Sequence, residues 1–234
     1  ILSDLNPKQQ QAVKHTEGPM LVLAGAGSGK TRCITYKVAY LIKEKQVAPQ
    51  RILLMTFTNK AAGEMKERVR LLTGNTGVLS GTFHSICAKI LRREAASINL
   101  PNNFVIYDED DQQQAIKQVM KNLNLSTRDY RPQAIANIIS QAKNELVGAH
   151  EYPQYARGHF QETVAKVYLG YQTLLKEAGA VDFDDLLLKT VELWQKNPAI
   201  LARYQNQWQY LLVDEYQDTN RAQFMLTKML SGRW

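Results

Sequence analysis

Two side chains suited to phosphate chemistry follow a glycine-rich stretch near the N-terminus. Residues 20–32, MLVLAGAGSGKTR, run from apolar residues through three glycines to Lys30 and Thr31. The backbone N–H groups of such a loop, together with the helix N-terminus behind it, can surround a phosphate chain. The Lys30 ammonium can reach the outer phosphates, and the Thr31 hydroxyl can hold Mg²⁺. The stretch therefore predicts a phosphate-binding loop.

This loop departs from the strict pattern at one position. The pattern G-x-x-x-x-G-K-[ST] requires glycine where the chain has Ala24, so only Gly29, Lys30 and Thr31 satisfy it as written. The context compensates, because a strand-like apolar run precedes the loop and residues 33–44 have helix-forming spacing. The alternative, a glycine loop without a ligand, would need neither the lysine nor the threonine.

A pair of acids near the C-terminus could complete the chemistry. The apolar run Tyr210–Val213 predicts a strand, and Asp214 and Glu215 follow it directly. Beside a bound triphosphate, Asp214 would hold Mg²⁺ through its water shell and Glu215 would act as general base on the attacking water. A solvated acidic turn is the alternative, and the phosphate-binding loop elsewhere in the chain disfavours it.

Polar side chains also follow a second predicted strand. Residues 51–57, RILLMTF, lack alternation, which is typical of a strand buried on both faces of a parallel sheet. Phe57, Thr58, Asn59 and Lys60 would emerge at its carboxyl end, where open α/β sheets place ligand sites. A stacking ring beside hydroxyl, amide and ammonium groups suits single-stranded nucleic acid. The alternative is that Phe57 is the last core residue of the strand.

Two weaker signals accompany these groups. Residues 78–82 predict a third strand, after which Thr82 and His84 open a helix, where His84 by itself is best explained as a hydrogen-bonding residue of the helix start. Asn6 and Pro7 predict the start of a short helix over residues 8–16. Its glutamines could match an adenine edge, although surface glutamines are the ordinary explanation.

The elements that position these groups predict an α/β fold of the P-loop NTPase (RecA-like) class, with a parallel sheet, helices on both faces and a mostly α-helical insertion. Strands and helices alternate at first, and helical patterns then dominate until strand signals return at Tyr210. A short strand-like FVIY at 104–107 interrupts the helices, and Asp108 and Asp182 are candidate N-caps. The expected domain bounds are 1–90 for the first core segment, 91–205 for the insertion and 206–234 for the returning core.

Composition restricts the function classes. Among 234 residues, 29 Lys and Arg outnumber 22 Asp and Glu, and the net charge of +7 favours a polyanionic partner, with solvated surface charge as the alternative. Two cysteines, Cys33 and Cys87, form no disulfide framework, and His84 with Cys87 does not make a zinc site. Neither a membrane span nor a signal-peptide pattern is found, so we expect a cytoplasmic protein.

Taken together, the motifs resemble the N-terminal part of the UvrD/Rep family of superfamily I DNA helicases. LNPKQQQAV resembles the family's Q motif, LAGAGSGKT its Walker A loop with the same alanine, MTFTNKAAGEM its motif Ia and GTFHS its motif Ib. LLVDEYQDTN resembles its DExx-box Walker B motif, and VDFDDLL from Val181 is also similar to family sequences. The resemblance covers essentially the whole chain, and its most specific parts are DEYQDTN and TFTNKAA.

That resemblance implies an ATP-dependent DNA helicase that moves 3′→5′ on single-stranded DNA and unwinds duplexes in replication or repair. The implied partners are single-stranded DNA and its junctions with duplex, and the implied cofactors are ATP and Mg²⁺. By motif position, Glu215 and Lys30 are catalytic, and Thr31 and Asp214 bind Mg²⁺. The implied ATP-binding residues are Gln9, Ala24, Gly25, Ala26, Gly27, Ser28, Gly29, Lys30, Thr31 and Arg32. The implied DNA-binding residues are Phe57, Thr58, Asn59, Lys60, Thr82 and His84.

Family members continue beyond this point with a GDxxQSIY motif and a second RecA-like core that supplies arginines to the transition state. The chain is therefore expected to be a first part with little or no activity of its own. One alternative is a nucleotide-dependent DNA-binding module without turnover. A P-loop kinase or transporter ATPase is a further alternative, but neither explains TFTNKAA or TFHS.

Overall fold

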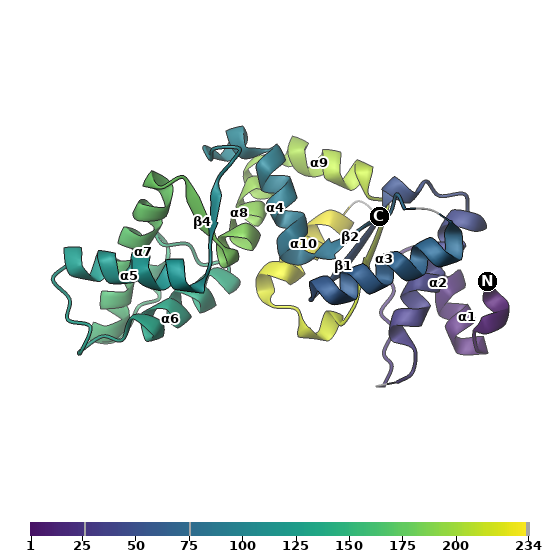
Figure 1. Cartoon of the computed structure of the whole chain (residues 1–234), viewed down its shortest axis with the longest axis horizontal. Coiled ribbons are helices and arrows are strands. Elements are labelled where there is room, and N and C mark those ends of the chain that lie inside the picture. The colour runs from purple at the N-terminus through teal and green to yellow at the C-terminus, as the bar shows by residue number, and fades with distance from the viewer. Residues whose placement is uncertain (26, 75, 233–234) are drawn as a thin grey trace. The chain divides into compact units, whose positions relative to one another are not determined.

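The computed structural model describes residues 1–25, 27–74 and 76–232 (Figure 1). The chain forms two compact units. We call residues 1–85, 197–219 and 227–234 the core unit, and Ile86–Lys196 with Asn220–Leu226 the helical unit. Parallel sheets and many helices confirm the predicted α/β class. The domain bounds expected from the sequence, 1–90, 91–205 and 206–234, stay a prediction.

A parallel three-stranded sheet organises the core unit. Its strands are β1 (Ile52–Thr56), β2 (Leu79–Thr82) and β5 (Tyr210–Val213), in the order β2-β1-β5 (Figure 1). All five residues of β1 are buried, which confirms the buried parallel strand predicted from its lack of alternation. Because the strands are parallel, their carboxyl ends share one edge of the sheet, and the candidate residues follow those ends.

Helices pack on this sheet through apolar faces. The core unit contains α1 (Pro7–Lys14), α2 (Lys30–Lys43), α3 (Asn59–Thr73) and α9 (Pro198–Gln207), together with three short 3₁₀ helices, η1 (Leu2–Asp4), η2 (Pro49–Arg51) and η5 (Tyr216–Asp218). Val38 and Leu41 of α2 and Met65 of α3 belong to the same buried cluster as Ile52 and Leu54 of β1. The predicted cap at Asn6 is confirmed, and Gln9 completes a capping box with it that the sequence analysis did not predict.

The predicted strand before the phosphate-binding loop is not formed. Residues 20–25 belong to neither sheet among the described residues, and Leu21 and Leu23 are 65% and 87% exposed. A strand needs a neighbour with free N–H and C=O groups, and residues 20–25 pair with neither edge strand of the described sheet, β2 or β5. The apolar pattern indicated a propensity for strand but could not supply the partner.

The helical unit surrounds a separate apolar core. Its helices are α5 (Glu109–Asn122), α6 (Pro132–Asn144), α7 (Gly158–Glu177) and α8 (Phe183–Lys196), with the short η3 (Ala95–Ile98) and η4 (Tyr152–Gln154). Helix α4 (Phe83–Arg93) begins in the core unit and continues into the helical unit (Figure 1). Helix α10 (Arg221–Ser231) begins in the helical unit and ends in the core unit. The buried cluster includes Ile116, Ile139, Tyr168 and Tyr171. In the part of the chain that the structure describes, every helix is too short or too polar to span a bilayer.

A two-stranded parallel sheet of β3 (Val105–Tyr107) and β4 (Ala180–Asp182) also lies in the helical unit. The sequence predicted β3 from the strand-like FVIY but did not predict β4. The two predicted N-caps are confirmed: Asp108 accepts from the Asp111 N–H at 2.9 Å, and Asp182 accepts from the Asp185 N–H at 2.8 Å.

A buried cation holds the start of α8. The Lys143 ammonium is fully buried and lies 2.6 Å from an Asp182 oxygen and 3.0 Å from an Asp185 oxygen. The Tyr171 hydroxyl donates to Asp182 at 2.9 Å. Burial works to lower the pKa of Lys143, but the two carboxylates outweigh it and hold that pKa above its usual value. The sequence did not predict this network.

Candidate functional site

The phosphate-binding loop is a compact turn ahead of α2. Gly27 and Gly29 have φ angles of 73° and 85°, in the left-handed region that favours glycine. The Ser28 hydroxyl donates to the Gly25 carbonyl at 2.7 Å. The Lys30 ammonium folds back and donates to the carbonyls of Ala24 and Gly25 at 3.3 and 3.4 Å. The predicted site residue Ala26 lies outside the described residues.

Gln9 contacts the loop with its side-chain amide. Its Nε2 donates to the Ser28 carbonyl at 3.0 Å, and its Oε1 accepts from the Asn6 N–H at 3.1 Å. A Cβ atom at Gly29 would lie 2.9 Å from Gln9 Nε2, so a larger residue there would displace the end of the Gln9 side chain. Both ends of the amide are thus occupied by protein groups, and adenine would have to replace at least one of them. The adenine-reading role stays a prediction.

Arg32, the last residue of the predicted nucleotide site, faces the N-terminal segment. Its guanidinium donates to the Asp4 carbonyl at 2.7 Å and lies 5.3 Å from the centre of the Tyr36 ring. The Tyr36 hydroxyl donates to the Asp4 carboxylate at 3.2 Å. Sequence reasoning missed Asp4 and Tyr36, and neither motif spacing nor periodicity would have identified this contact.

The structure brings the phosphate-binding loop and the first acid together. Asp214 follows β5, and its N–H donates to the Met55 carbonyl at 3.0 Å, which continues the sheet by one residue. The Thr31 hydroxyl and the Lys30 ammonium lie near enough to the Asp214 carboxylate to affect its pKa. Burial and the neighbouring charge of Glu215 raise the pKa of Asp214, while Thr31 and Lys30 act in the opposite direction.

Glu215 occupies an unusual backbone conformation. Its φ and ψ are 50° and 44°, left-handed values that cost a residue with a Cβ on the order of 1 kcal/mol. Its carboxylate accepts from Gln217 Nε2 at 2.6 Å. Sequence reasoning did not single out Gln217, although its place in DEYQD next to the predicted base was a usable signal. The turn therefore presents two adjacent carboxylates, one beside the loop and one held by a neighbouring amide.

A donor set for a hard divalent cation is present. Among the described residues, no group of three or more His, Cys, Asp or Glu side chains could enclose a metal ion. Mg²⁺ at phosphate sites typically takes only one or two protein ligands and completes its shell with phosphate oxygens and water. The contacting Thr31 hydroxyl and Asp214 carboxylate fit that requirement.

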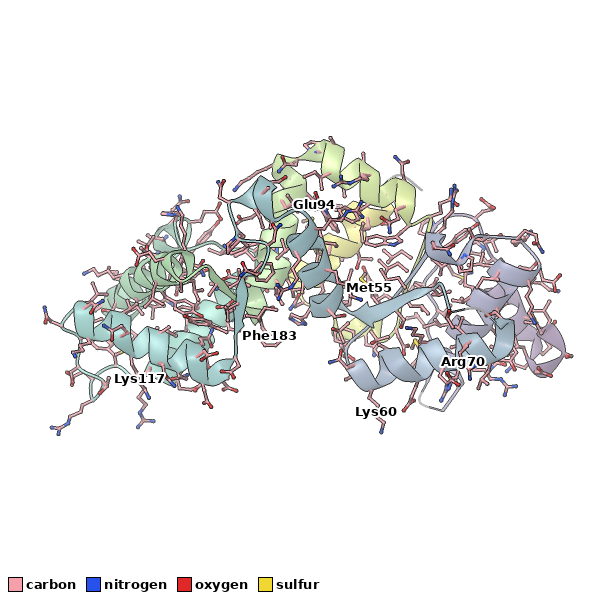
Figure 2. The ribbon with its side chains drawn as sticks, turned by 45° about the horizontal axis from the view of Figure 1, so that its top comes forward. Met55, Lys60, Arg70, Glu94, Lys117 and Phe183 are labelled. Carbon is pink, nitrogen blue, oxygen red and sulfur yellow. The ribbon has the colours of Figure 1, made fainter. Side chains whose placement is uncertain are left out.

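The predicted DNA-binding residues follow β1 and β2, which are neighbours in register, with Thr56 opposite Thr82. Thr58 caps α3 by accepting from the Ala61 N–H at 3.1 Å, and Thr82 accepts from the Ser85 N–H at 3.1 Å. Both hydroxyls thus serve helix starts. Figure 2 shows the Lys60 side chain extending away from the ribbon at the start of α3, where it is exposed.

Phe57 is half-buried, with its ring centre 5.8 Å from that of the buried Phe83. The ring therefore contributes to packing and also keeps an accessible part. The structure is consistent both with a core residue at the end of the strand and with a ring that stacks on a base. His84 is half-buried in the first turn of α4, and burial lowers its pKa, which favours the neutral imidazole at pH 7. The DNA-binding roles of these residues stay predictions.

The fold is α/β, and the glycine-rich loop ahead of α2 has the form predicted for a P-loop protein. The family described as UvrD/REP helicase N-terminal domain matches residues 5–233, and the chain belongs to this family. It is 49% identical over 236 residues to the ATP-dependent DNA helicase PcrA of Bacillus subtilis (strain 168). It is 47% identical to the proteins of that name from Staphylococcus aureus (strain Mu50) and Leuconostoc citreum. In each case all of this chain matches 32% of the relative, so it spans about a third of their length.

Proposed function

We propose that this chain is the nucleotide-binding part of an ATP-dependent DNA helicase. The observation that carries the proposal is the compact glycine loop ahead of α2, whose Lys30 and Thr31 lie near enough to Asp214 at the end of β5 to affect its pKa. A structural turn would not need an ammonium, a hydroxyl and a buried carboxylate at one place. Family membership and the printed names of the relatives support the same activity.

Each residue then has a defined role. Lys30 leaves the carbonyls of Ala24 and Gly25 to reach the outer phosphates, which compensate the ammonium far better than two neutral oxygens. Thr31 and Asp214 hold Mg²⁺, which neutralises charge that develops on the phosphates. Glu215 accepts a proton from the attacking water. Burial removes water from the Asp214 carboxylate and so disfavours its negative charge. A bound cation would compensate for that loss and stabilise the charged form.

The distribution of charge supports single-stranded DNA as the partner of the core unit. Acidic and basic side chains balance in the helical unit, so the net charge of +7 belongs to the core unit. There, Phe57 offers a partly accessible ring, and Asn59 and Lys60 are exposed beside it. A stacking face with neighbouring polar and positive groups is what a single strand requires.

Lys30→Ala tests the nucleotide site directly. We expect the variant to lose measurable ATP binding, because the loop then offers only backbone N–H groups to a highly charged triphosphate. Titration of the chain with a fluorescent ATP analogue in the presence of Mg²⁺ measures this affinity. Lys43→Ala is the matched control, since Lys43 lies exposed in the last turn of the same helix. Unchanged affinity in Lys30→Ala would remove the nucleotide from this loop.

Phe57→Ala tests the DNA interface. We expect a weaker affinity for single-stranded DNA by about 1 to 3 kcal/mol, the usual contribution of a base-stacking aromatic, at an unchanged salt dependence. Fluorescence anisotropy of a labelled oligothymidylate at several salt concentrations measures both quantities. Phe160→Ala is the matched control, because Phe160 is also partly exposed but lies on the helical unit.

Lys60→Ala should show the opposite behaviour in the same assay. Loss of one phosphate contact lowers the slope of log affinity against log salt by about 1, whatever the DNA sequence.

Circular dichroism of Phe57→Ala checks the remaining interpretation of Phe57, that it is a core residue. An unfolded Phe57→Ala chain, or one with wild-type DNA affinity, would contradict a stacking role and leave the packing on Phe83 as its function.

A further inference from the structure

Helix α6 ends in a polar residue that contacts two other segments of the helical unit. Asn144 Nδ2 donates to an Asp184 carboxylate oxygen at 3.1 Å and to the Ser140 carbonyl at 2.9 Å. Its Oδ1 accepts from Asn220 Nδ2 at 2.5 Å. All of these residues belong to the helical unit, and both ends of the Asn144 amide are occupied. The orientation of the amide is therefore determined by its partners.

Asn220 is in turn the cap of α10. Its Oδ1 accepts from the Gln223 N–H at 2.9 Å, and its own N–H donates to Gln223 Oε1 at 3.0 Å, which is a reciprocal capping box. Gln223 is buried, and the preceding residue, Ala222, is fully buried as well. The Nδ2 group of Asn220 takes no part in this cap, and Asn144 accepts a hydrogen bond from it.

Asn220 follows directly on the turn that carries the proposed general base. That turn starts at Asp214, whose N–H is held by the Met55 carbonyl, and it includes η5. Internal hydrogen bonds run from the Asp218 N–H to the Glu215 carbonyl at 3.0 Å and from the Thr219 hydroxyl to the Tyr216 carbonyl at 2.8 Å. A left-handed residue with a Cβ persists only where its surroundings determine it, and a segment anchored at one end could relax.

We propose that Asn144 is a positioning residue for Glu215. It anchors Asn220, and with it the far end of the turn, so that Glu215 keeps the strained conformation in which its carboxylate is presented. This inference rests on the proposed function, since it assigns Glu215 the role of base. It also makes the rate of hydrolysis depend on a side chain of the helical unit that touches neither nucleotide nor metal.

The first experiment separates turnover from binding. In the protein at its full natural length, with saturating single-stranded DNA, we expect Asn144→Ala to lower kcat for ATP hydrolysis by about 10- to 100-fold, because small displacements of a reacting group have effects of that size. The affinity for a fluorescent ATP analogue should stay within about twofold of wild type. Asn137→Ala is the matched control on α6, where the exposed side chain accepts from Gln133 Nε2 at 3.0 Å.

A second variant separates the contact from the cap. Asn220→Asp keeps the oxygen that caps α10, replaces the N–H donor from which Asn144 accepts by an acceptor oxygen, and adds a negative charge at the start of α10. It should therefore reproduce the loss of kcat with an intact helix. In hydrogen exchange of the 234-residue chain, both variants should speed exchange at amides 215–220, with no change in peptides from α6 and α8.

The outcomes are distinguishable. Wild-type kcat in Asn144→Ala, or faster exchange spread over the whole helical unit, would overturn the positioning role and leave a purely structural one. Those results would leave the proposed function intact as long as Lys30→Ala abolishes nucleotide binding. If Lys30→Ala binds ATP normally, the proposed function fails and this inference fails with it.

Discussion

Glu215→Gln is expected to leave ATP bound and to slow its hydrolysis by about 100- to 10,000-fold, the range that a positioned general base contributes. Glutamine retains the shape of the side chain and an oxygen that can still accept from Gln217, but it cannot take a proton from water. Single-turnover phosphate release with saturating single-stranded DNA, in the protein at its full natural length, measures the chemical step. Nucleotide titration in parallel shows that binding persists.

Two further variants define the origin of that effect. Asp214→Asn should instead give a defect that higher Mg²⁺ concentrations partly restore, because the change weakens a metal ligand. Glu64→Gln is the matched control, since Glu64 is exposed on α3. Turnover of Glu215→Gln within a few-fold of wild type would assign the base to another residue.

Lys143→Met is expected to destabilise the helical unit by about 3 to 5 kcal/mol, which is the usual cost of removing one partner from a buried ion pair. Methionine nearly fills the space of the lysine side chain, so the loss comes from charge and not from a cavity. Asp182 and Asp185 would then be buried beside each other with only the partly exposed Lys189 ammonium, 4.0 Å from Asp185, as a remaining cation. The free energy of opening is measured by hydrogen exchange of peptides from α7 and α8.

The control is Lys117→Met on α5, where the lysine is exposed (Figure 2) and an effect within about 0.5 kcal/mol is expected. Adding Asp182→Asn and Asp185→Asn to Lys143→Met should recover part of the loss, because the uncompensated charges are removed. A loss below about 1 kcal/mol in Lys143→Met would mean that the two carboxyl groups become protonated at little cost.

Much of the site was predictable because its signals are local. A glycine loop ending in Lys30 and Thr31 predicts a phosphate site from adjacent residues, and the apolar strand before Asp214 indicates where that acid emerges. Caps such as Asn6 and Asp182 are predictable for the same reason, since each involves a residue and an amide three positions later. The buried β1 followed from its unbroken apolar run.

The remainder depended on partners far apart in the chain. Residues 20–23 have the composition of a strand, yet strand formation requires a free neighbour that composition cannot specify. Lys143 was indistinguishable from a surface lysine until the fold placed Asp182 and Asp185 beside it. The Asn144 contact with Asn220 spans 76 positions and leaves no periodic trace.

By itself, the sequence determined the chemical groups of this protein, their order along strands and helices, and the ends of most elements, because these follow from short-range sterics and hydrogen bonding. Only the tertiary structure decided that Thr31 meets Asp214, that Gln9 is bonded to the loop, and that Glu215 adopts a left-handed conformation. Each of these outcomes depends on groups that are distant in the sequence. A buried or strained group is stabilised only when the fold brings a particular backbone or charged group next to it.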